Sequence, residues 1–402
     1  MNTPICRALA EHSAKNYIKF HTGSRASLAA DIAFPSDFQA WDFTELPGLD
    51  NLHCPSGVIL EAQELAADAF GAERTFFSVN GSTAAILALI LGSFNPGDTI
   101  VLDRGSHVSA FNACILAQLK VVLVHPVFQD GIPVIQDINL FLEAAKKNKA
   151  KGVFLTRPNY YGCATDLLGL SKDLHKLGKF ILVDEAHGTH FGFNPFLPMS
   201  AIMSGADGVA QSAHKTLGAL NQTAFLHVNG SFIDISRVEQ ALSMVQTTSP
   251  SYPLLASLDY SRAWLEKEGF KKYEILINAV DLFWEKLKPP FRKAVTSVPQ
   301  DPTRLTIRTD SMDGNKVAQE LREDFGIQVE FSNENYLVCI AVPGDEHELI
   351  SLAEALNQSK CAECESADLS IVEEFPPGVP DKEIYDIIRT KIDIIDNGGT
   401  HG

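Results

Sequence analysis

The chain has 402 residues, of which 45% are hydrophobic and 21% are charged, and its formal net charge at pH 7 is −17. These values are typical of a soluble globular protein that is long enough to bury a large core. The excess of acid disfavours a nucleic acid or an anionic membrane as partner, and no apolar run approaches the roughly 20 residues that span a bilayer.

The N-terminus and the cysteines bear on where the protein works. The start, MNTPICRALAEHSAK, lacks a basic stretch followed by an apolar block, so no signal peptide is visible. The seven cysteines are scattered and odd in number, which favours reduced thiols and a cytoplasmic location. Cys361 and Cys364 have C-x-x-C spacing, but no second Cys or His pair lies nearby, so we interpret them as a chance surface pair and expect no metal.

The first 70 residues predict two helices. One could run from Ile5 to Ile18, and residues 42–53 then form a stretch rich in turn formers and acids. From Val58 to Phe70 the apolar positions follow helical spacing, and Gly71 is expected to end that helix.

Strand and helix patterns then alternate. Strands are predicted at 75–79, 99–102, 121–124, 152–156, 180–183 and 208–210, and helices at 82–91, 107–118, 137–149 and 166–177. Repeated strand–helix units indicate an α/β fold with a mostly parallel sheet and helices on both of its faces. Residues 223–227 predict one antiparallel strand, and helices follow from 233 to about 288.

Pro289-Pro290 marks a predicted boundary. After it come a strand at 304–307, a helix at 316–325, strands at 328–331 and 336–341, and a helix at 346–356, which together predict a small α+β domain. A last helix is expected at about 382–395. The predicted division is therefore an N-terminal segment at 1–50, a large domain at 51–288 and a small C-terminal α+β domain at 289–402.

The predicted strands at 180–183 and 208–210 are short and apolar without polar alternation, as in buried parallel strands. Asp184-Glu185-Ala186-His187 follows the first, and Gln211-Ser212-Ala213-His214-Lys215-Thr216 ends the second. The carboxyl ends of parallel strands meet at the edge of a sheet where ligands bind. An acid and a flanked lysine at this edge indicate a site for an electrophilic, anionic cofactor, although Asp184 alone could be a helix cap.

A second feature of this edge is the run Phe76–Thr83, which predicts a strand, a tight turn and a helix. The free amides of the helix N-terminus and the hydroxyls of Ser82 and Thr83 predict an anion site, unless either residue is an ordinary N-cap. His107 follows the next strand, at the same edge of the sheet. A lone histidine at such a position is more often a hydrogen-bonded structural residue than a functional one.

Two nucleotide-binding classes are excluded. Val183-Asp-Glu-Ala-His187 resembles the acidic box of a helicase-type NTPase, but the chain has no G-x-x-x-x-G-K-[ST] loop. A Rossmann dehydrogenase would need G-x-G-x-x-G after its first strand, and that motif is absent too. An anion cradle, a histidine ring, an acid and a lysine are instead the parts that pyridoxal 5'-phosphate needs.

These motifs resemble the ornithine/lysine/arginine decarboxylase family, which comprises fold-type I, aspartate-aminotransferase-like pyridoxal phosphate enzymes. The resemblance rests on Glu45–His53, Asn80–Thr83, Asp103-Arg104, His107, Asn159–Gly162, Asp184–His187 and Gln211–Thr216. It implies a mostly parallel central sheet flanked by helices, with a smaller C-terminal α+β domain. It also implies that Lys215 carries the Schiff base, that Asp184 pairs with the pyridine nitrogen and that His107 stacks on the ring. By the same resemblance Ser82, Thr83, Ser212 and His214 hold the phosphate, His187 lies beside the ring, and Gly81 and Ala186 complete the cofactor-binding set.

The activity that the resemblance implies is decarboxylation of a basic amino acid (arginine, lysine or ornithine) through an external aldimine and a quinonoid, with release of CO2 and an amine. Asp42, Glu45, Asp50, Glu373 and Glu374 are candidates to bind a distal cation of the substrate. The resemblance further implies a homodimer, or a higher even-numbered homo-oligomer, with residues 40–53 reaching the partner.

Two segments depart from the family pattern. Residues 21–25 read His-Thr-Gly-Ser-Arg where the family usually has His-x-Pro-Gly-His-Lys, and Pro376–Pro380 continues to Asp381-Lys-Glu instead of Pro-Gly-Glu. Both segments border the substrate side in the family. A pyridoxal phosphate lyase, aldolase or aminotransferase acting on a modified amino acid therefore stays an alternative, with a non-catalytic regulator that binds the same cofactor as a more remote one.

Overall fold

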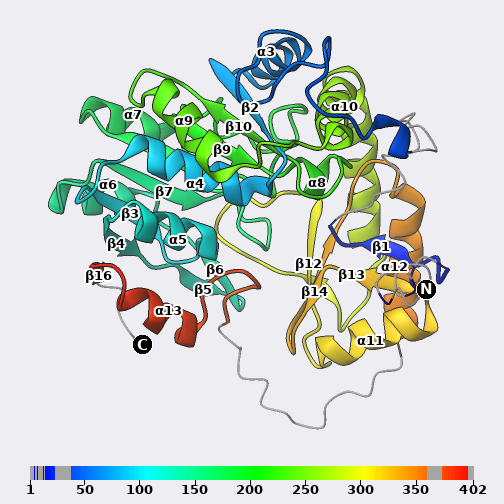
Figure 1. Cartoon of the computed structure of the whole chain (residues 1–402). Coiled ribbons are helices and arrows are strands. Elements are labelled where there is room, and N and C mark those ends of the chain that lie inside the picture. The colour runs from blue at the N-terminus through cyan, green and yellow to red at the C-terminus, as the bar shows by residue number, and fades with distance from the viewer. Residues whose placement is uncertain are drawn as a thin grey trace.

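The computed structural model describes residues 14–22, 38–359 and 374–396, together with Pro4, Arg7 and His12. Its main element is an eight-stranded sheet in the order β16-β4-β3-β7-β8-β9-β10-β2 (Figure 1). The strands are β2 (Arg74–Ser78), β3 (Thr99–Asp103), β4 (Lys120–Val124), β7 (Gly152–Thr156), β8 (Phe180–Asp184), β9 (Gly208–Gln211), β10 (Ala224–Val228) and β16 (Ile394–Asp396). β10 pairs antiparallel with β9 and β2, and the other neighbours are parallel, as predicted.

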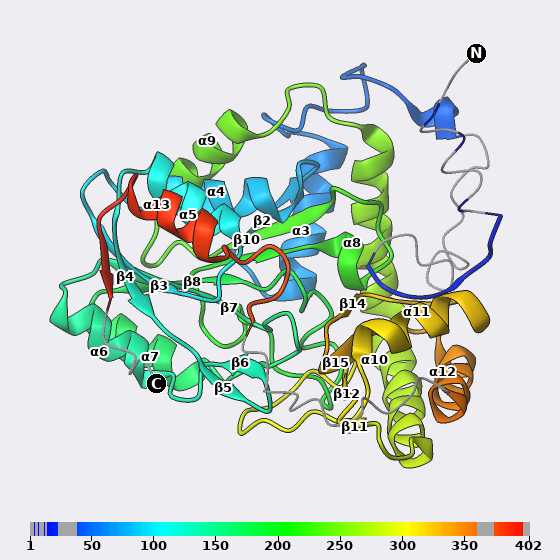
Figure 2. The same cartoon turned by 90° about the horizontal axis from the view of Figure 1, so that it is seen from below.

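Helices cover both faces of this sheet (Figure 2). α4 (Gly81–Ser93), α5 (Val108–Leu116) and α9 (Ile235–Val245) pack on one face, and α6 (Asn139–Lys147) and α7 (Leu168–Lys176) pack on the other. Leu182 points to the first layer, and its neighbours Ile181 and Val183 point to the second. Both faces are therefore apolar, which explains why these strands read as continuous hydrophobic runs.

A four-stranded antiparallel sheet, β11-β12-β15-β14, forms the smaller unit. It contains β11 (Arg292–Lys293), β12 (Arg304–Arg308), β14 (Phe331–Ser332) and β15 (Tyr336–Ile340), with α11 (Gly314–Asp324) and α12 (Glu346–Gln358) alongside. β1 (Ile18–Phe20) pairs parallel with β13 (Ile327–Val329) in a separate two-stranded sheet, and β5 (Val127–Gln129) pairs with β6 (Ile132–Val134).

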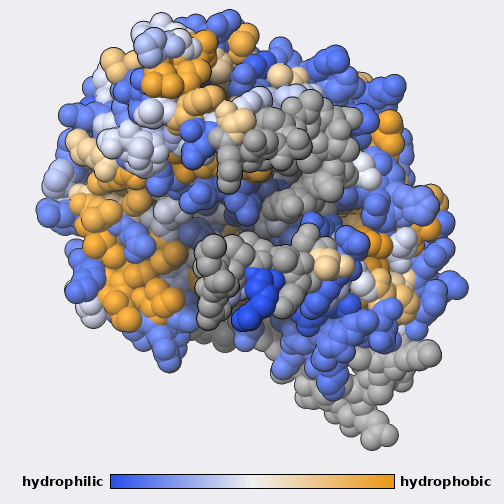
Figure 3. Space-filling model, turned by 45° about the vertical axis from the view of Figure 1, so that its right-hand side comes forward, coloured by the Kyte–Doolittle hydropathy of each residue, from blue (hydrophilic) through white to orange (hydrophobic). Residues whose placement is uncertain are grey.

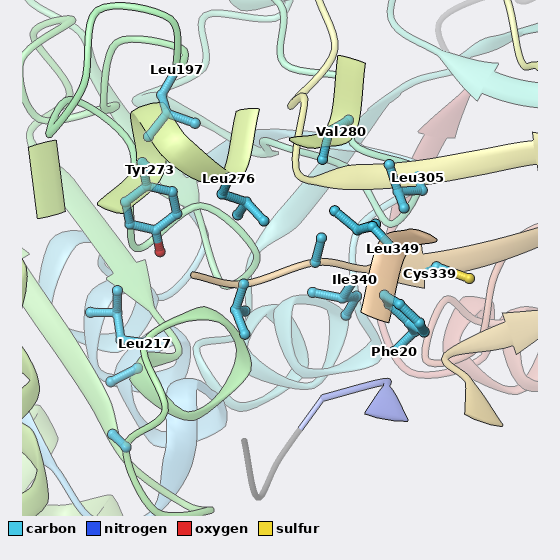
Figure 4. Packing of buried hydrophobic residues seen from close by; sticks show 14 of the residues in the cluster. Phe20, Leu197, Leu217, Tyr273, Leu276, Val280, Leu305, Cys339, Ile340 and Leu349 are labelled. Carbon is cyan, nitrogen blue, oxygen red and sulfur yellow. The ribbon is translucent and has the colours of Figure 1, made fainter. Parts of the chain in front are cut away.

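One apolar core joins the two units along α10 (Tyr252–Lys286), while α3 (Val58–Phe70) packs against α10 and β2. Figure 4 shows Tyr273 on the same side as Leu197 and Leu217, Val280 on the side of Leu305 and Leu349, and Leu276 between the two sides. The long helix therefore fixes the four-stranded sheet against the edge of the large sheet. Among the described helices, none combines the length and the apolar composition needed to cross a bilayer.

Two predicted helices are wrong in part. The helix expected at 382–395 ends earlier, because α13 (Lys382–Arg389) is followed by the strand β16, which pairs with Val121–Leu123 of β4. Those three residues gain a hydrogen-bonded ladder by covering the otherwise open edge of the large sheet. Ile18 likewise starts β1 instead of ending a helix, while most of the helix predicted at 5–18 lies outside the described residues.

The β1–β13 and β16–β4 pairings cross the predicted boundaries between 1–50, 51–288 and 289–402, and this division stays a prediction. Residues 18–20 lie with β13, and residues 394–396 lie in the large sheet rather than with the four-stranded one. Figures 1 and 2 both draw α13 beside α5. Residues 23–25 and 397–402, Cys361, Cys364 and Glu373 lie outside the described residues.

Candidate active site

A cavity of about 300 Å³ lies at the carboxyl ends of β3, β7 and β8. It brings together nine of the ten residues predicted for the site: Gly81, Ser82, Thr83, His107, Asp184, Ala186, His187, His214 and Lys215. The tenth, Ser212, lies just behind the wall, where its hydroxyl donates to Ser82 Oγ at 2.8 Å. The predicted residues therefore lie together, as expected from the convergence of parallel strand ends at one edge of the sheet, while their roles stay a prediction.

The first turn of α4 forms one end of the cavity. Gly81 has φ +73°, a conformation that favours glycine, and its amide donates to the carbonyl of Gln222 at 2.7 Å. α4 carries no acidic side chain in its first turn, so its positive N-terminal partial charge is not offset there. The hydroxyls of Ser82 and Thr83 lie at the same end and complete a set of donors suited to an anion.

Lys215 lies in α8 (Ala213–Thr216), with its Nζ 3.0 Å from Nε2 of His187. On the other side of that ring, Nη2 of Arg304 lies 2.7 Å from Nδ1. Because a guanidinium can only donate, Nδ1 accepts and the proton of the neutral ring sits on Nε2. That proton points to Lys215 Nζ, which accepts it as a neutral amine.

The charge environment agrees with a neutral lysine. Burial lowers the pKa of Lys215, and the charge of Asp184 only partly opposes this effect. Burial also lowers the pKa of His187 to well below its ordinary value, with the charge of Arg304 acting in the same direction. A buried lysine with a depressed pKa is a nucleophile, which is the property that attack on a carbonyl carbon requires.

Arg304 acts through His187 and is thus a positioning residue. It is fully buried at the start of β12, and it approaches Gly162 so closely that a Cβ there would lie 2.7 Å from Arg304 Cβ. Gly162 has φ +87°, so both the turn and the close approach call for glycine. The glycine of the motif Asn159-Tyr-Tyr-Gly162 therefore makes room for an arginine 142 positions later in the chain.

Asp184 ends β8 inside the cavity, and its Oδ1 accepts the amide of Ala186 at 3.0 Å. Burial raises the pKa of Asp184, while the charge of Lys215 lowers it. The structure describes residues 185–207 in full, and no helix begins there, so the alternative that Asp184 caps a helix is wrong. Asp103 lies nearby at the end of β3, where burial raises its pKa to about 6.

His107 is the N-cap of α5. Its Nδ1 accepts the amide of Ser109 at 3.2 Å, which leaves the proton of the neutral ring on Nε2. Burial lowers the pKa of His107, and this favours the neutral ring. Gly378 packs directly against the ring: a Cβ at that position would lie 2.6 Å from His107 Cδ2.

The second divergent segment forms a wall of the cavity, with Phe375, Pro376, Pro377 and Val379 among the lining residues. Arg104 holds this turn in place. Its Nη2 donates to the carbonyl of Pro380 at 2.9 Å, and its guanidinium lies 4.6 Å from the ring centre of Phe375 and 4.3 Å from that of Tyr385.

A buried polar chain crosses five neighbouring strands beneath the cavity. Arg157 Nη1 donates to Glu185 at 2.9 Å, Gln211 donates to the other oxygen of Glu185 at 2.8 Å, and His227 bridges Gln211 to Thr75. Burial raises the pKa of Glu185 to about 7, although the charge of Arg157 lowers it. Each link joins one strand, or the residue that follows it, to the next, so the chain connects β7, β8, β9, β10 and β2 across the sheet.

The acids predicted to bind a distal cation do not line the cavity where the structure describes them. Asp42 and Glu374 are exposed, Glu45 is half-buried, and the carboxylate of Asp50 accepts backbone amides at the start of α3. The first divergent segment nevertheless reaches the site, because the amide of Thr22 donates to Glu330 Oε2 at 2.7 Å.

Three functional candidates, Arg157, Arg304 and Glu330, were missed at the sequence level. Arg157 carries a usable signal, since it directly follows the apolar strand β7 at the edge where ligands bind. Arg304 and Glu330 come from the smaller unit, and nothing in their local sequence connects them with the strand ends of the larger sheet.

Comparisons with known proteins agree with this geometry. Residues 3–288 match the family model described as Orn/Lys/Arg decarboxylase, major domain. The chain is 34% identical over 378 residues to arginine decarboxylase of Bacillus subtilis (strain 168), covering 89% of this chain and 77% of that protein. It is 36% identical over 377 residues to arginine decarboxylase of Bacillus anthracis, covering 88% and 76%.

Among solved structures, the lysine decarboxylase LdcF of Francisella novicida superposes with a TM-score of 0.70 at 18% identity. The match covers 88% of this chain and 61% of that one, so the chain spans about three fifths of that enzyme's length. This likeness confirms the predicted α/β fold of fold-type I pyridoxal phosphate enzymes. The chain therefore belongs to the Orn/Lys/Arg decarboxylase family of amino-acid decarboxylases, as its strand-end motifs predict.

Proposed function

We propose that this protein decarboxylates a free basic amino acid, with pyridoxal 5'-phosphate as cofactor on Lys215. The observation that carries the proposal is the buried Lys215, whose Nζ lies 3.0 Å from Nε2 of His187, in one cavity with the buried carboxylate of Asp184. The relatives from Bacillus are named arginine decarboxylases, which makes arginine the first substrate to test.

The residues present fit the cofactor. The amides of the first turn of α4 and the hydroxyls of Ser82, Thr83 and Ser212 would hold the phosphate. Oδ1 of Asp184 is occupied by the amide of Ala186, which leaves Oδ2 to accept the proton of the pyridine nitrogen. When bound, the cofactor supplies an electron sink for the carbanion that forms as CO2 leaves.

The chain's own groups prepare that chemistry. Arg304 keeps Nδ1 of His187 in the acceptor state, so His187 presents its Nε2 proton to Lys215 and not a competing lone pair. His107 presents a neutral ring whose orientation is fixed by Ser109. Ile86, Ile135, Leu155 and Phe375 give the cavity apolar walls, which exclude water and strengthen the electrostatic interactions inside.

Two measurements test the proposal. Borohydride treatment of the cofactor-loaded protein, followed by peptide mapping, should leave the pyridoxyl mass on Lys215, and a label on another lysine would refute the site assignment. CO2 and amine should then be measured together for arginine, lysine, ornithine and uncharged amino acids. Equal amounts of both from a basic amino acid are expected, whereas a keto acid or aldehyde product without CO2 would contradict decarboxylation.

We further propose a homodimer that covers an apolar groove of about 310 Å³ between residues 41–49, α3 and α10. Trp41, Phe43 and Val58 line the groove and are exposed in the described chain. Figure 3 shows apolar atoms gathered near the top of the molecule, the level at which Figure 1 draws α3. Contiguous apolar surface of this kind is rare on monomers, and a two-fold partner is the commonest way to cover it.

Light scattering tests the dimer. Phe43→Glu should shift the particle mass towards that of the monomer, while Met244→Glu, at an exposed position on α9, should leave it unchanged. A wild-type protein that stays monomeric and fully active at micromolar concentration would overturn this proposal.

A further inference from the structure

Glu330 lies at the junction of β13 and β14, beside the cavity. Its Oε1 accepts the hydroxyl of Tyr160 at 3.1 Å, and Tyr160 is one of the lining residues. The ring of Tyr160 stands edge-on to that of His187, with the ring centres 5.4 Å apart. One aromatic side chain therefore separates the carboxylate of Glu330 from the ring that contacts Lys215.

The orientation of Glu330 is fixed from two sides. β1 runs parallel to β13 with Phe20 opposite Val329, which brings the amide of Thr22 to Glu330 Oε2 at 2.7 Å. The backbone of Glu330 itself donates to the carbonyl of Val338 at 3.0 Å. A carboxylate has about four acceptor positions, so roughly two stay free after these two bonds.

The charge of Glu330 has no ion-pair partner among the described residues, since no lysine, arginine or histidine there lies within ion-pair distance of it. It still acts on the site. Burial lowers the pKa of Lys215 and of Arg304, and the charge of Glu330 opposes the shift at both groups. A half-buried carboxylate that acts on the Arg304 guanidinium without contacting it is open to a further cation.

The other described carboxylates near the cavity are less suited to this role. Asp184 and Asp103 lie at the strand ends on the cofactor side, and Asp103 Oδ1 accepts the amide of Gly105 at 2.7 Å. Neither Glu374 nor Glu330 is itself a lining residue, but Glu374 is exposed, whereas Glu330 is half-buried and bonded to the lining residue Tyr160.

We propose that Glu330 is the specificity-determining residue that binds the distal cationic group of the substrate. This inference rests on the proposed function, because it names the group that reads a basic side chain. A cation gains a charge-assisted bond at the free positions of Glu330, whereas a neutral side chain leaves them unmatched. Thr22 belongs to the first segment that departs from the family pattern, so that segment serves the substrate side by orienting Glu330.

Steady-state kinetics with matched substrates test the inference. Glu330→Gln keeps the size and one oxygen acceptor but removes the charge. We expect its KM for arginine, lysine or ornithine, whichever the wild type uses, to rise by about 10- to 100-fold. The KM of the uncharged analogue (citrulline, norleucine or norvaline, respectively) should stay within about twofold, since an uncharged end group gains no charge-assisted bond. Glu330→Asp should recover part of the loss, and Glu374→Gln is the matched control and should behave as wild type.

A binding measurement separates this inference from the proposed function. Calorimetry with agmatine, cadaverine and putrescine needs no turnover, and at least one of these amines should bind the cofactor-loaded wild type more tightly than it binds Glu330→Gln by the same factor. Equal binding to both proteins, or no binding to the wild type, overturns the role of Glu330. Equal losses for charged and neutral substrates also overturn it, and would mean that Glu330 only supports Arg304. A wild type that binds these amines but releases no CO2 would refute decarboxylation alone.

Discussion

Replacing Gly378 with alanine should disturb the site through one defined contact. The added Cβ would lie 2.6 Å from His107 Cδ2 and 2.9 Å from its Nε2, and ordinary contact begins at 3.4 Å. Either the ring or the turn must therefore retreat by about 0.8 Å. The ring is held by Ser109, and the turn is held by the bond from the Val108 amide to the Gly378 carbonyl at 2.8 Å, so neither moves freely.

The expected losses follow from this geometry. Alanine at φ +87° costs about 1–2 kcal/mol in backbone strain, and overpacking of this kind costs a further 1–3 kcal/mol, roughly. A displacement near 1 Å of a group at the reacting centre lowers kcat/KM by about 100-fold. We therefore expect Gly378→Ala to fold with reduced stability and to lose most of its decarboxylase activity.

Gly97→Ala is the matched control. Gly97 has nearly the same dihedral, φ +85°, and nothing lies within 4 Å of its Cβ position, so it carries the backbone strain without the contact. Urea denaturation and kcat/KM should be measured for both variants. Equal stabilities together with wild-type activity in Gly378→Ala would show that the turn does not position His107.

Three further outcomes follow from the structure. Asp184→Asn should leave a folded protein that still binds pyridoxal phosphate, as absorbance would show, but its turnover should fall by orders of magnitude because the pyridine nitrogen loses its anionic partner; normal turnover would exclude that role. Gly152→Ala places a Cβ 2.4 Å from the buried ring of Phe180 and should lower the free energy of unfolding by about 1–3 kcal/mol, while Gly169→Ala, with open space around it in α7, should be neutral or stabilising. Burial raises the pKa of Asp50, but the backbone amides that it accepts outweigh this and lower it to about 2. Its contribution is thus present above the unfolded pKa near 3.8 and lost as the pH falls through about 2, so the melting temperatures of wild type and Asp50→Asn should differ at pH 7 and converge over that window.

The parts of the site that could be predicted from sequence are those that lie next to a strand in the chain. Asp184 and Lys215 each follow an apolar run directly, and Ser82 opens a helix after one, so local pattern and the convergence of parallel strand ends suffice to bring them together. The distances between these residues in sequence do not matter, because the parallel strands of one sheet place their carboxyl ends at the same edge.

What local pattern could not supply are the contacts between the two units. Arg304 stands at the start of a fully buried strand, and its partner His187 is 117 positions away. β16 was missed because three residues carry too little pattern, and their pairing depends on the free edge of β4. The same holds for Glu330, whose function depends on Tyr160 and Thr22 and not on its own neighbours in the chain.

The wall formed by residues 375–379 has a consequence for how the protein is made. During synthesis the helix start at Gly81 is made first and Lys215 about midway. The turn that packs on His107 is among the last of the described residues to be made. β16 then seals the sheet by pairing with a strand synthesised about 270 positions earlier. Since contacts of such long range form slowly, a nascent chain holds the groups proposed to bind the cofactor before the cavity is closed. Until then the cavity stays open on the side that the C-terminal segment later covers.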